Sequence, residues 1–170
     1  MYICAMKGRK KQPYRILFVC LGNICRSPAA EVVCAAEAVR RGEQDMFEFD
    51  SAGLYGGHAG DLPDRRMREH AYLRGYSFSH HARQVCSTDF HDFDLIVAMD
   101  DSNYSALRRL APTPEGERKI VRMIDYVADK RGQFSVPDPY YEGAEGFELV
   151  LDMLEDGARG LLASAEKEIG

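Results

Sequence analysis

Residues 15–28 read Arg-Ile-Leu-Phe-Val-Cys-Leu-Gly-Asn-Ile-Cys-Arg-Ser-Pro. The first six form a short, almost continuous apolar run that ends at a glycine-containing turn, which is typical of a strand buried on both faces of a parallel sheet. Ser27 and Pro28 then favour a helix start, because serine suits a cap position and proline is pre-set for the first helical turn. The stretch therefore predicts a strand, a tight loop and a helix in direct succession.

Further along the chain, apolar runs alternate with helical apolar stripes. They predict strands over residues 47–51, 94–99 and 119–123, and helices over about 63–74, 100–110 and 147–165. Strands that alternate with helices indicate right-handed βαβ units. We therefore expect an α/β chain with a single-domain three-layer fold, in which a central, roughly four-stranded parallel sheet is flanked by helices on both faces. The domain is expected to span residues 14–170, after a loosely ordered N-terminal extension over residues 1–13.

The composition narrows the classes of partner. The 170 residues carry a net charge of −5, whereas a nucleic-acid-binding domain would show a basic surplus on one face. Nothing approaches the apolar length needed to cross a bilayer, and residues 1–6 are too few for a signal-peptide core. The five cysteines have no repeated spacing, which argues against a disulfide framework and against a structural zinc site. We expect a cytoplasmic monomer that binds neither nucleic acid nor a membrane.

The loop between the first strand and the first helix carries the chemistry. A sharp turn at Gly22 lets successive backbone N–H groups point inward and form a concavity for an oxyanion, to which the helix N-terminus adds further donors. Arg26 supplies a planar, permanently charged fork for phosphate oxygens. The positive charge of Arg26 and of the helix N-terminus favours the thiolate form of Cys20. This thiolate is placed to attack phosphorus. The alternative is that Cys20 is only a buried cysteine at a strand end.

Residues 19–28 resemble the signature of the low-molecular-weight protein tyrosine phosphatases. The resemblance continues, in the same order along the chain, through Ser51-Ala-Gly53, His80-His-Ala-Arg-Gln84, Ala98-Met-Asp-Asp-Ser-Asn103 and Asp138-Pro-Tyr-Tyr141. It implies a phosphatase that hydrolyses phosphotyrosine or other aryl phosphate monoesters through a phosphocysteine intermediate, with no cofactor and no metal. The implied partner is a phosphotyrosine-containing protein.

The resemblance also implies a role for each matching residue. Cys20 is the expected nucleophile, Arg26 the phosphate clamp, and Asp138 the acid that protonates the leaving oxygen. The expected phosphate-binding residues are Leu21, Gly22, Asn23, Ile24, Cys25, Arg26 and Ser27. The expected loop supports are Asn23, Ser27, Ser51, His80 and Asp100, with Asp100 as the partner of His80.

Substrate contacts and redox behaviour are expected from other positions. Tyr140 and Tyr141 are expected to wall the slot for a phenyl ring, although either could be an ordinary packing residue. The family commonly carries an aromatic residue where this chain has Gly57, and Tyr55 or His58 could supply that surface. Cys25 is expected to form a protective disulfide with oxidised Cys20; the alternative is a small residue that fills space behind the loop.

Three alternative functions stay open. An arsenate reductase uses a similar loop but passes oxidation along two further cysteines, and only Cys86 lies in a comparable region. A phosphocysteine carrier would need neither Arg26 nor an acid. A non-catalytic phosphotyrosine-binding module would be expected to lack the nucleophile. The presence of both Cys20 and Asp138 favours an active phosphatase.

Overall fold

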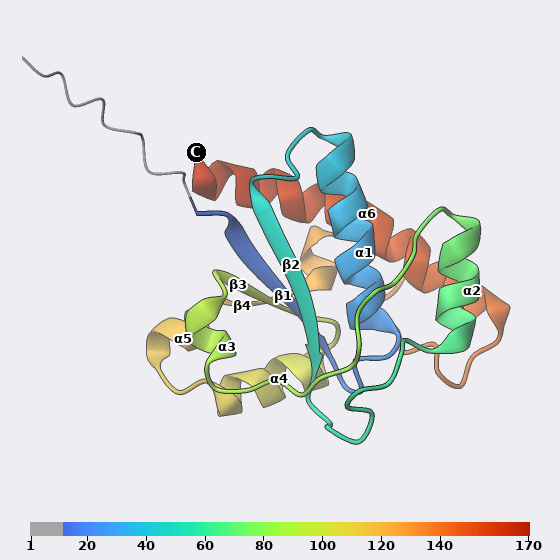
Figure 1. Ribbon diagram of the computed structural model, residues 1–170, viewed down its shortest axis with the longest axis horizontal. Coiled ribbons are helices and arrows are strands. Elements are labelled where there is room, and N and C mark those ends of the chain that lie inside the picture. The colour runs from blue at the N-terminus through green and yellow to red at the C-terminus, as the bar shows by residue number, and fades with distance from the viewer. Residues whose placement is uncertain (1–11) are drawn as a thin grey trace, which may run out of the picture.

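A computed structural model describes residues 12–170 of the chain (Figure 1). Four parallel strands form one sheet in the order β2-β1-β3-β4. Their bounds are Tyr14–Cys20 for β1, Phe47–Gly53 for β2, Leu95–Ala98 for β3 and Ile120–Arg122 for β4. The register pairs Cys20 with Gly53 and Val19 with Ala98, so the carboxyl ends of the three strands β1, β2 and β3 meet at one edge.

Helices cover both faces of this sheet, as Figure 1 shows. The α-helices are α1 (Arg26–Arg40), α2 (Arg65–Leu73), α3 (Asp89–Asp92), α4 (Asp101–Leu110), α5 (Pro114–Arg118) and α6 (Ala144–Ile169), and a 3-10 helix, η1, spans Met123–Tyr126. Helices α1, α2 and α6 bury their apolar sides with one face of the sheet, and α3 and α4 with the other. The predicted three-layer α/β fold is confirmed.

The alternation of side chains along β1 explains the two layers of core. Ile16, Phe18 and Cys20 belong to the cluster under α1 and α6, whereas Leu17 and Val19 belong to the cluster under α3 and α4. Successive residues of a strand point to opposite faces, so an uninterrupted apolar run is what a doubly covered strand requires. Burying each such side chain contributes about 1.5–3 kcal/mol.

The predicted strands and helices are present, with ends that differ by up to four residues, and the structure adds short elements. Helices α3 and α5 and the 3-10 helix η1 were not predicted, and η1 takes Met123 from the predicted fourth strand. Ser27 does not cap α1: it lies inside the helix, and Cys25 holds the cap position without a side-chain hydrogen bond to the helix. Most of the predicted extension over residues 1–13 lies outside the described residues.

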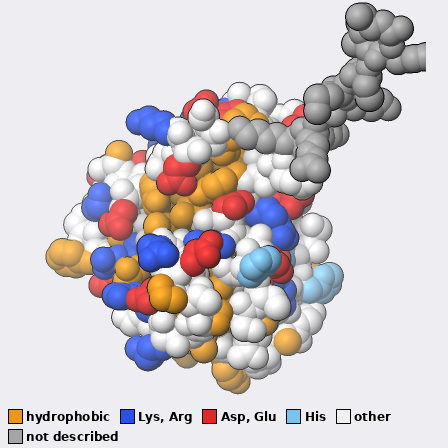
Figure 2. Space-filling model, turned by 90° about the vertical axis from the view of Figure 1, so that its left-hand side faces the viewer, with side chains coloured by type: hydrophobic (Ala, Val, Ile, Leu, Met, Phe, Trp, Pro, Cys, Tyr) orange, Lys and Arg blue, Asp and Glu red, His pale blue; other side chains and the backbone are white. Residues whose placement is uncertain are grey.

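Charge is mixed on the face drawn in Figure 2, where basic and acidic side chains alternate and neither sign forms a continuous patch.

Within residues 12–170, no helix combines the length and the apolar composition that crossing a bilayer requires.

Candidate active site

The loop over residues 20–27 joins the end of β1 to the start of α1 at the carboxyl edge of the sheet. The side chains of Cys20 and Ser27 are buried and meet there, with 2.9 Å between Sγ and Oγ. Parallel sheets bind ligands at this edge. The fold therefore places the sequence-predicted thiol where a ligand can reach the N-terminus of α1.

Asn23 holds the loop in shape from behind. Its backbone is left-handed, with φ 56°, a conformation that asparagine adopts more readily than most residues. Its Oδ1 accepts the backbone N–H of Arg83 at 3.0 Å and Nε2–H of His80 at 2.7 Å. Its Nδ2 donates to Ser27 Oγ at 2.9 Å, which leaves the Ser27 hydroxyl proton for Cys20 Sγ. A single buried amide therefore fixes both the loop and the hydrogen bond to the thiol.

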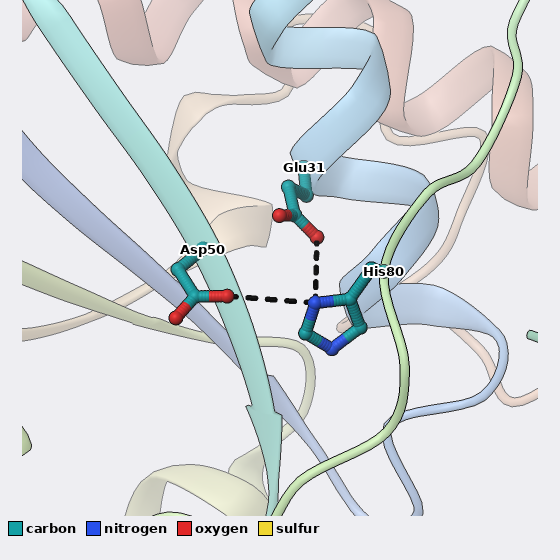
Figure 3. A group of neighbouring side chains, drawn as sticks. All are labelled: Glu31, Asp50 and His80. Atoms are coloured by element: carbon teal, nitrogen blue, oxygen red, sulfur yellow. Dashed lines mark ion pairs between the residues drawn. The ribbon is translucent and has the colours of Figure 1, made fainter. Parts of the chain in front are cut away.

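His80 is held in turn by two carboxylates. Figure 3 shows its Nδ1 between Glu31, at 3.6 Å, and Asp50, at 3.5 Å. Ser51 Oγ donates to Glu31 at 2.9 Å, so Ser51 supports the loop through Glu31 rather than by direct contact. Burial raises the pKa of Glu31 to about 7 and lowers the pKa of His80.

The same three side chains are the described group that could hold a metal ion, since their ligand atoms lie within 4.8 Å of one another. Each already has a protein partner. Asp50 pairs with Arg83, Glu31 accepts from Ser51, and the far nitrogen of His80 donates to Asn23. We therefore read the group as the outer support of the loop.

Arg26 is buried and is oriented by residues from two distant segments. Its Nη1 donates to Asp100 Oδ2 at 2.8 Å and to the Val136 carbonyl at 3.1 Å. Asp100 also caps α4, because its Oδ1 accepts the N–H of Asn103 at 2.7 Å. The predicted pairing of Asp100 with His80 is wrong: the two carboxylates beside His80 come from α1 and β2, whereas Asp100 lies beyond the end of β3 and reaches Arg26.

Asp138 approaches the loop on the segment between η1 and α6. Val136 N donates to Met99 O at 3.0 Å, which fastens this segment to the end of β3. The Asp138 carboxylate lies 3.7 Å from Arg26 Nη2. Tyr140 and Tyr141 follow it, with their rings edge to face at 4.9 Å. Arg66 of α2 donates to the Tyr140 carbonyl at 2.9 Å and places its guanidinium over the Tyr140 ring.

These groups line one cavity of about 240 Å³. Its walls are Cys20, Leu21, Gly22, Ile24, Cys25, Arg26, Tyr55, His58, Asp138, Tyr140 and Tyr141. Two of the predicted phosphate-binding residues, Asn23 and Ser27, are fully buried and do not line it. The cavity can hold a phosphate at the helix N-terminus, and it sets a thiol, a guanidinium and a carboxylate around it.

A family model for low molecular weight phosphotyrosine protein phosphatases matches residues 15–169. The chain belongs to this family. This confirms the family and the enzyme class that the sequence predicts, a phosphoric monoester hydrolase. A low molecular weight protein-tyrosine-phosphatase of Streptomyces coelicolor is 43% identical over 157 residues, which are 92% of this chain and 96% of that protein.

Solved structures agree with the family assignment. A protein tyrosine phosphatase from Entamoeba histolytica, crystallised with Hepes in its active site, matches with a TM-score of 0.88 and 41% identity over 92% of this chain and 99% of that one. A Drosophila arginine phosphatase matches with a TM-score of 0.81 and 34% identity over 88% of this chain and 96% of that one.

Sequence reasoning missed several supports of this phosphatase loop. Glu31 and Asp50 lie beside His80, and Arg83 donates its backbone N–H to Asn23. The Val136 carbonyl accepts from Arg26, and Arg66 donates to the Tyr140 carbonyl. Arg83 lies within the His80-His-Ala-Arg-Gln84 motif, so its place near the loop could have been predicted from the sequence. The others are common residue types in ordinary surroundings, and only the fold brings them to the site.

Proposed function

We propose that the protein hydrolyses phosphotyrosine through a phosphocysteine intermediate on Cys20. The observation that carries the proposal is the placement of the Cys20 thiol at the wall of a cavity shared with Arg26 and Asp138. The Ser27 hydroxyl donates to the Cys20 sulfur, and such a hydrogen bond favours the thiolate form that attacks phosphorus.

In the first step, the phosphate is held by the loop amides and by the Arg26 fork. The Cys20 thiolate attacks phosphorus, the bond from phosphorus to the phenolic oxygen breaks, and protonated Asp138 gives its proton to that oxygen. Charge on the transferring group is stabilised by donors that are already in position, which is the usual source of large rate gains in phosphoryl transfer.

In the second step, a water replaces the departed phenol. The Asp138 carboxylate takes a proton from this water, the water oxygen bonds to phosphorus, and the bond from sulfur to phosphorus breaks. Inorganic phosphate leaves and the thiolate returns, accepting the hydrogen bond of Ser27. Arg26 and the loop amides are sufficient for the charge in both steps, so we propose that the reaction needs no metal.

The shape of the cavity favours an aryl leaving group. Tyr55, Tyr140 and Tyr141 line it together with Ile24, and flat apolar walls suit a phenyl ring. We propose a phosphotyrosine-containing protein as the substrate, and a cytoplasmic monomer as the working form. Since one structural relative is an arginine phosphatase, a phosphoarginine peptide is the substrate to test against phosphotyrosine.

Hydrolysis of p-nitrophenyl phosphate and of a phosphotyrosine peptide, both in the presence of a chelator, tests the proposal. Cys20→Ser should lose all measurable turnover, and Asp138→Ala should lose most rate on phosphotyrosine, whose leaving group is the poorer one. Cys86→Ser, at an exposed cysteine, is the matched control and should keep wild-type rates. Full activity in Cys20→Ser, or faster wild-type hydrolysis of phosphoarginine than of phosphotyrosine, would contradict the proposal.

The alternative functions give different results in the same assay. A carrier would accumulate phosphocysteine without releasing phosphate. An arsenate reductase would consume a thiol reductant with arsenate, and its relay would need a second cysteine near Cys86, which the chain does not have. A binding module would release no phosphate and would retain the peptide.

A further inference from the structure

We propose that Arg66 of α2 is a positioning residue for the acid Asp138, because it fastens the segment that carries Asp138 to the phosphate-binding loop. The inference rests on the proposed phosphatase function and concerns the transfer of the proton to the leaving oxygen. Arg66 is not among the residues that line the cavity, so its effect on the reaction passes through the residues that it contacts.

The segment that carries Asp138 has few attachments of its own. It is fixed at Val136, whose backbone is hydrogen-bonded to the end of β3. Beyond that point its internal hydrogen bonds are local, such as the one from Tyr140 N to Asp138 Oδ1 at 3.1 Å. In the described part of the chain, the hydrogen bond that reaches residues 137–143 from another element comes from Arg66, whose Nη2 donates to the Tyr140 carbonyl at 2.9 Å.

The Arg66 guanidinium also contacts two aromatic rings. Its Cζ lies 5.4 Å from the centroid of the Tyr140 ring and 4.8 Å from that of Phe147. Phe147 is buried in the first turn of α6, and the ring of His70 stacks on it at 5.5 Å. Since His70 follows Arg66 by four residues, both side chains lie on the same face of α2. The guanidinium therefore has a defined position, although the side chain of Arg66 is 45% exposed.

Asp64 connects Arg66 to the phosphate-binding loop. The Asp64 carboxylate caps α2 by accepting the backbone N–H of Arg66 at 2.8 Å, and its second oxygen accepts from Nη2 of the same residue at 3.1 Å. The backbone N–H of Asp64 donates to the carbonyl of Ile24, in the loop, at 2.6 Å. A continuous path of hydrogen bonds thus runs from the loop, through Asp64 and Arg66, to the segment that carries Asp138.

Loss of this connection should weaken proton transfer more than phosphate binding. A positioned general acid contributes about 10²- to 10⁴-fold to a rate, and a small displacement removes part of that gain. We expect Arg66→Ala to lower kcat/KM for phenyl phosphate by about tenfold, because phenoxide is a poor leaving group. The loss for 2,4-dinitrophenyl phosphate should be less than about twofold, since its leaving group departs without a proton. The inhibition constant of inorganic phosphate should stay unchanged.

The test is a double-mutant cycle of Arg66→Ala and Asp138→Ala, with phenyl phosphate and 2,4-dinitrophenyl phosphate as substrates. If Arg66 acts through Asp138, Arg66→Ala should have no further effect on phenyl phosphate hydrolysis once the carboxylate is gone. A residue that only stabilises the fold would lower the rates on both substrates, with or without Asp138.

Two further variants complete the experiment. Arg66→Lys keeps a donor for the Tyr140 carbonyl but loses the planar fork, so it should recover part of the rate on phenyl phosphate. If Arg66→Ala fails to fold, Arg66→Lys takes its place in the cycle. Arg65→Ala is the matched control: Arg65 is the neighbouring residue of α2, is exposed and pairs with Glu69, so both rates should match wild type.

Three results would overturn the inference. They are a wild-type kcat/KM for phenyl phosphate in Arg66→Ala, equal losses on the two substrates, and losses that multiply in the double variant. A wild-type protein that hydrolyses neither aryl phosphate would instead overturn the proposed function, so the two failures are distinguishable.

Discussion

The guanidinium of Arg26 and the carboxylate of Asp100 lie 2.8 Å apart and join the first turn of α1 to the cap of α4. The Val136 carbonyl, which accepts from the same nitrogen, adds the segment that carries Asp138. The residue proposed to grip phosphate is therefore oriented from two other parts of the chain before substrate arrives.

Asp100→Asn should separate orientation from helix capping. Asparagine caps helices as well as aspartate, so the cap of α4 is retained, while the loss of the carboxylate leaves the buried Arg26 guanidinium without its ion-pair partner and lets the fork move. We expect kcat/KM for an aryl phosphate to fall by about 10- to 100-fold. Asp101→Asn, one residue along and exposed, is the control and should leave kcat/KM at the wild-type value. Equal activity of the two variants would contradict the role of Asp100.

Asn23 combines an unusual backbone with three side-chain contacts, and two substitutions separate these. Asn23→Gly keeps the left-handed conformation and loses the contacts; Asn23→Ala loses both. We expect both variants to lose most activity, and Asn23→Gly to be more stable than Asn23→Ala by about 1 kcal/mol. Urea unfolding measures the difference. Equal stabilities would mean that the backbone at residue 23 relaxes without cost.

Glu31 should make stability depend on pH in a defined direction. Burial raises its pKa to about 7, so the folded chain binds this proton more tightly than the unfolded chain does. The stabilising effect is complete below the unfolded pKa and is lost as pH rises through about 7. Burial lowers the pKa of His80, which acts in the opposite sense, because stability falls as pH drops through the folded pKa of that group.

Comparison with Glu31→Gln isolates the Glu31 effect. From pH 5 to pH 7.5, the free energy of unfolding of the wild type should fall relative to that of the variant by up to about 3 kcal/mol, since each pKa unit corresponds to about 1.4 kcal/mol. Glu145→Gln, at an exposed position at the start of α6, should follow the wild type across the range. A wild type that gains stability relative to Glu31→Gln would show that the sign is wrong.

Cys25 should protect Cys20 from irreversible oxidation. Burial raises the pKa of the Cys25 thiol, so it stays protonated and does not compete with Cys20 as a nucleophile. Peroxide converts the Cys20 thiol to a sulfenic acid, and condensation with the Cys25 thiol forms a disulfide and releases water. Peptide mapping after peroxide treatment should find the 20–25 disulfide in the wild type. Cys25→Ser should yield sulfinic or sulfonic acid at Cys20, and the same products in the wild type would reject protection.

The fold follows from local patterns that are strong in this chain. The apolar run over residues 15–20 and the stripe along α6 each exceed what a surface element needs, and a doubly covered sheet is the arrangement that buries them. Helices α3 and α5 escaped prediction because four or five residues are too few to show a helical period. The start of α1 was misread because Ser27, a good cap by type, gives its hydroxyl to the thiol.

The site was predictable where its residues are contiguous and unpredictable where they pair across the chain. Residues 20–27 and Asp138 could be found from short motifs. The partners of Arg26 and His80 could not, because several acidic residues, among them Asp50 within β2 and Asp100 just after β3, lie near the edge at which the strands end. Which carboxylate pairs with Arg26 and which with His80 depends on the directions of the side chains. These directions are set only when α1 and α4 have packed against the sheet.

The position of β1 in the middle of a parallel sheet has a consequence for synthesis. The nascent chain presents Cys20 early, while β3 beside it, Asp138 of the same cavity and α6, which packs on α1, are all made later. Until those segments leave the ribosome, Cys20 lacks the groups that orient and shield it and is an ordinary thiol. The enzyme therefore cannot act on other nascent or folded proteins before its own translation is nearly finished.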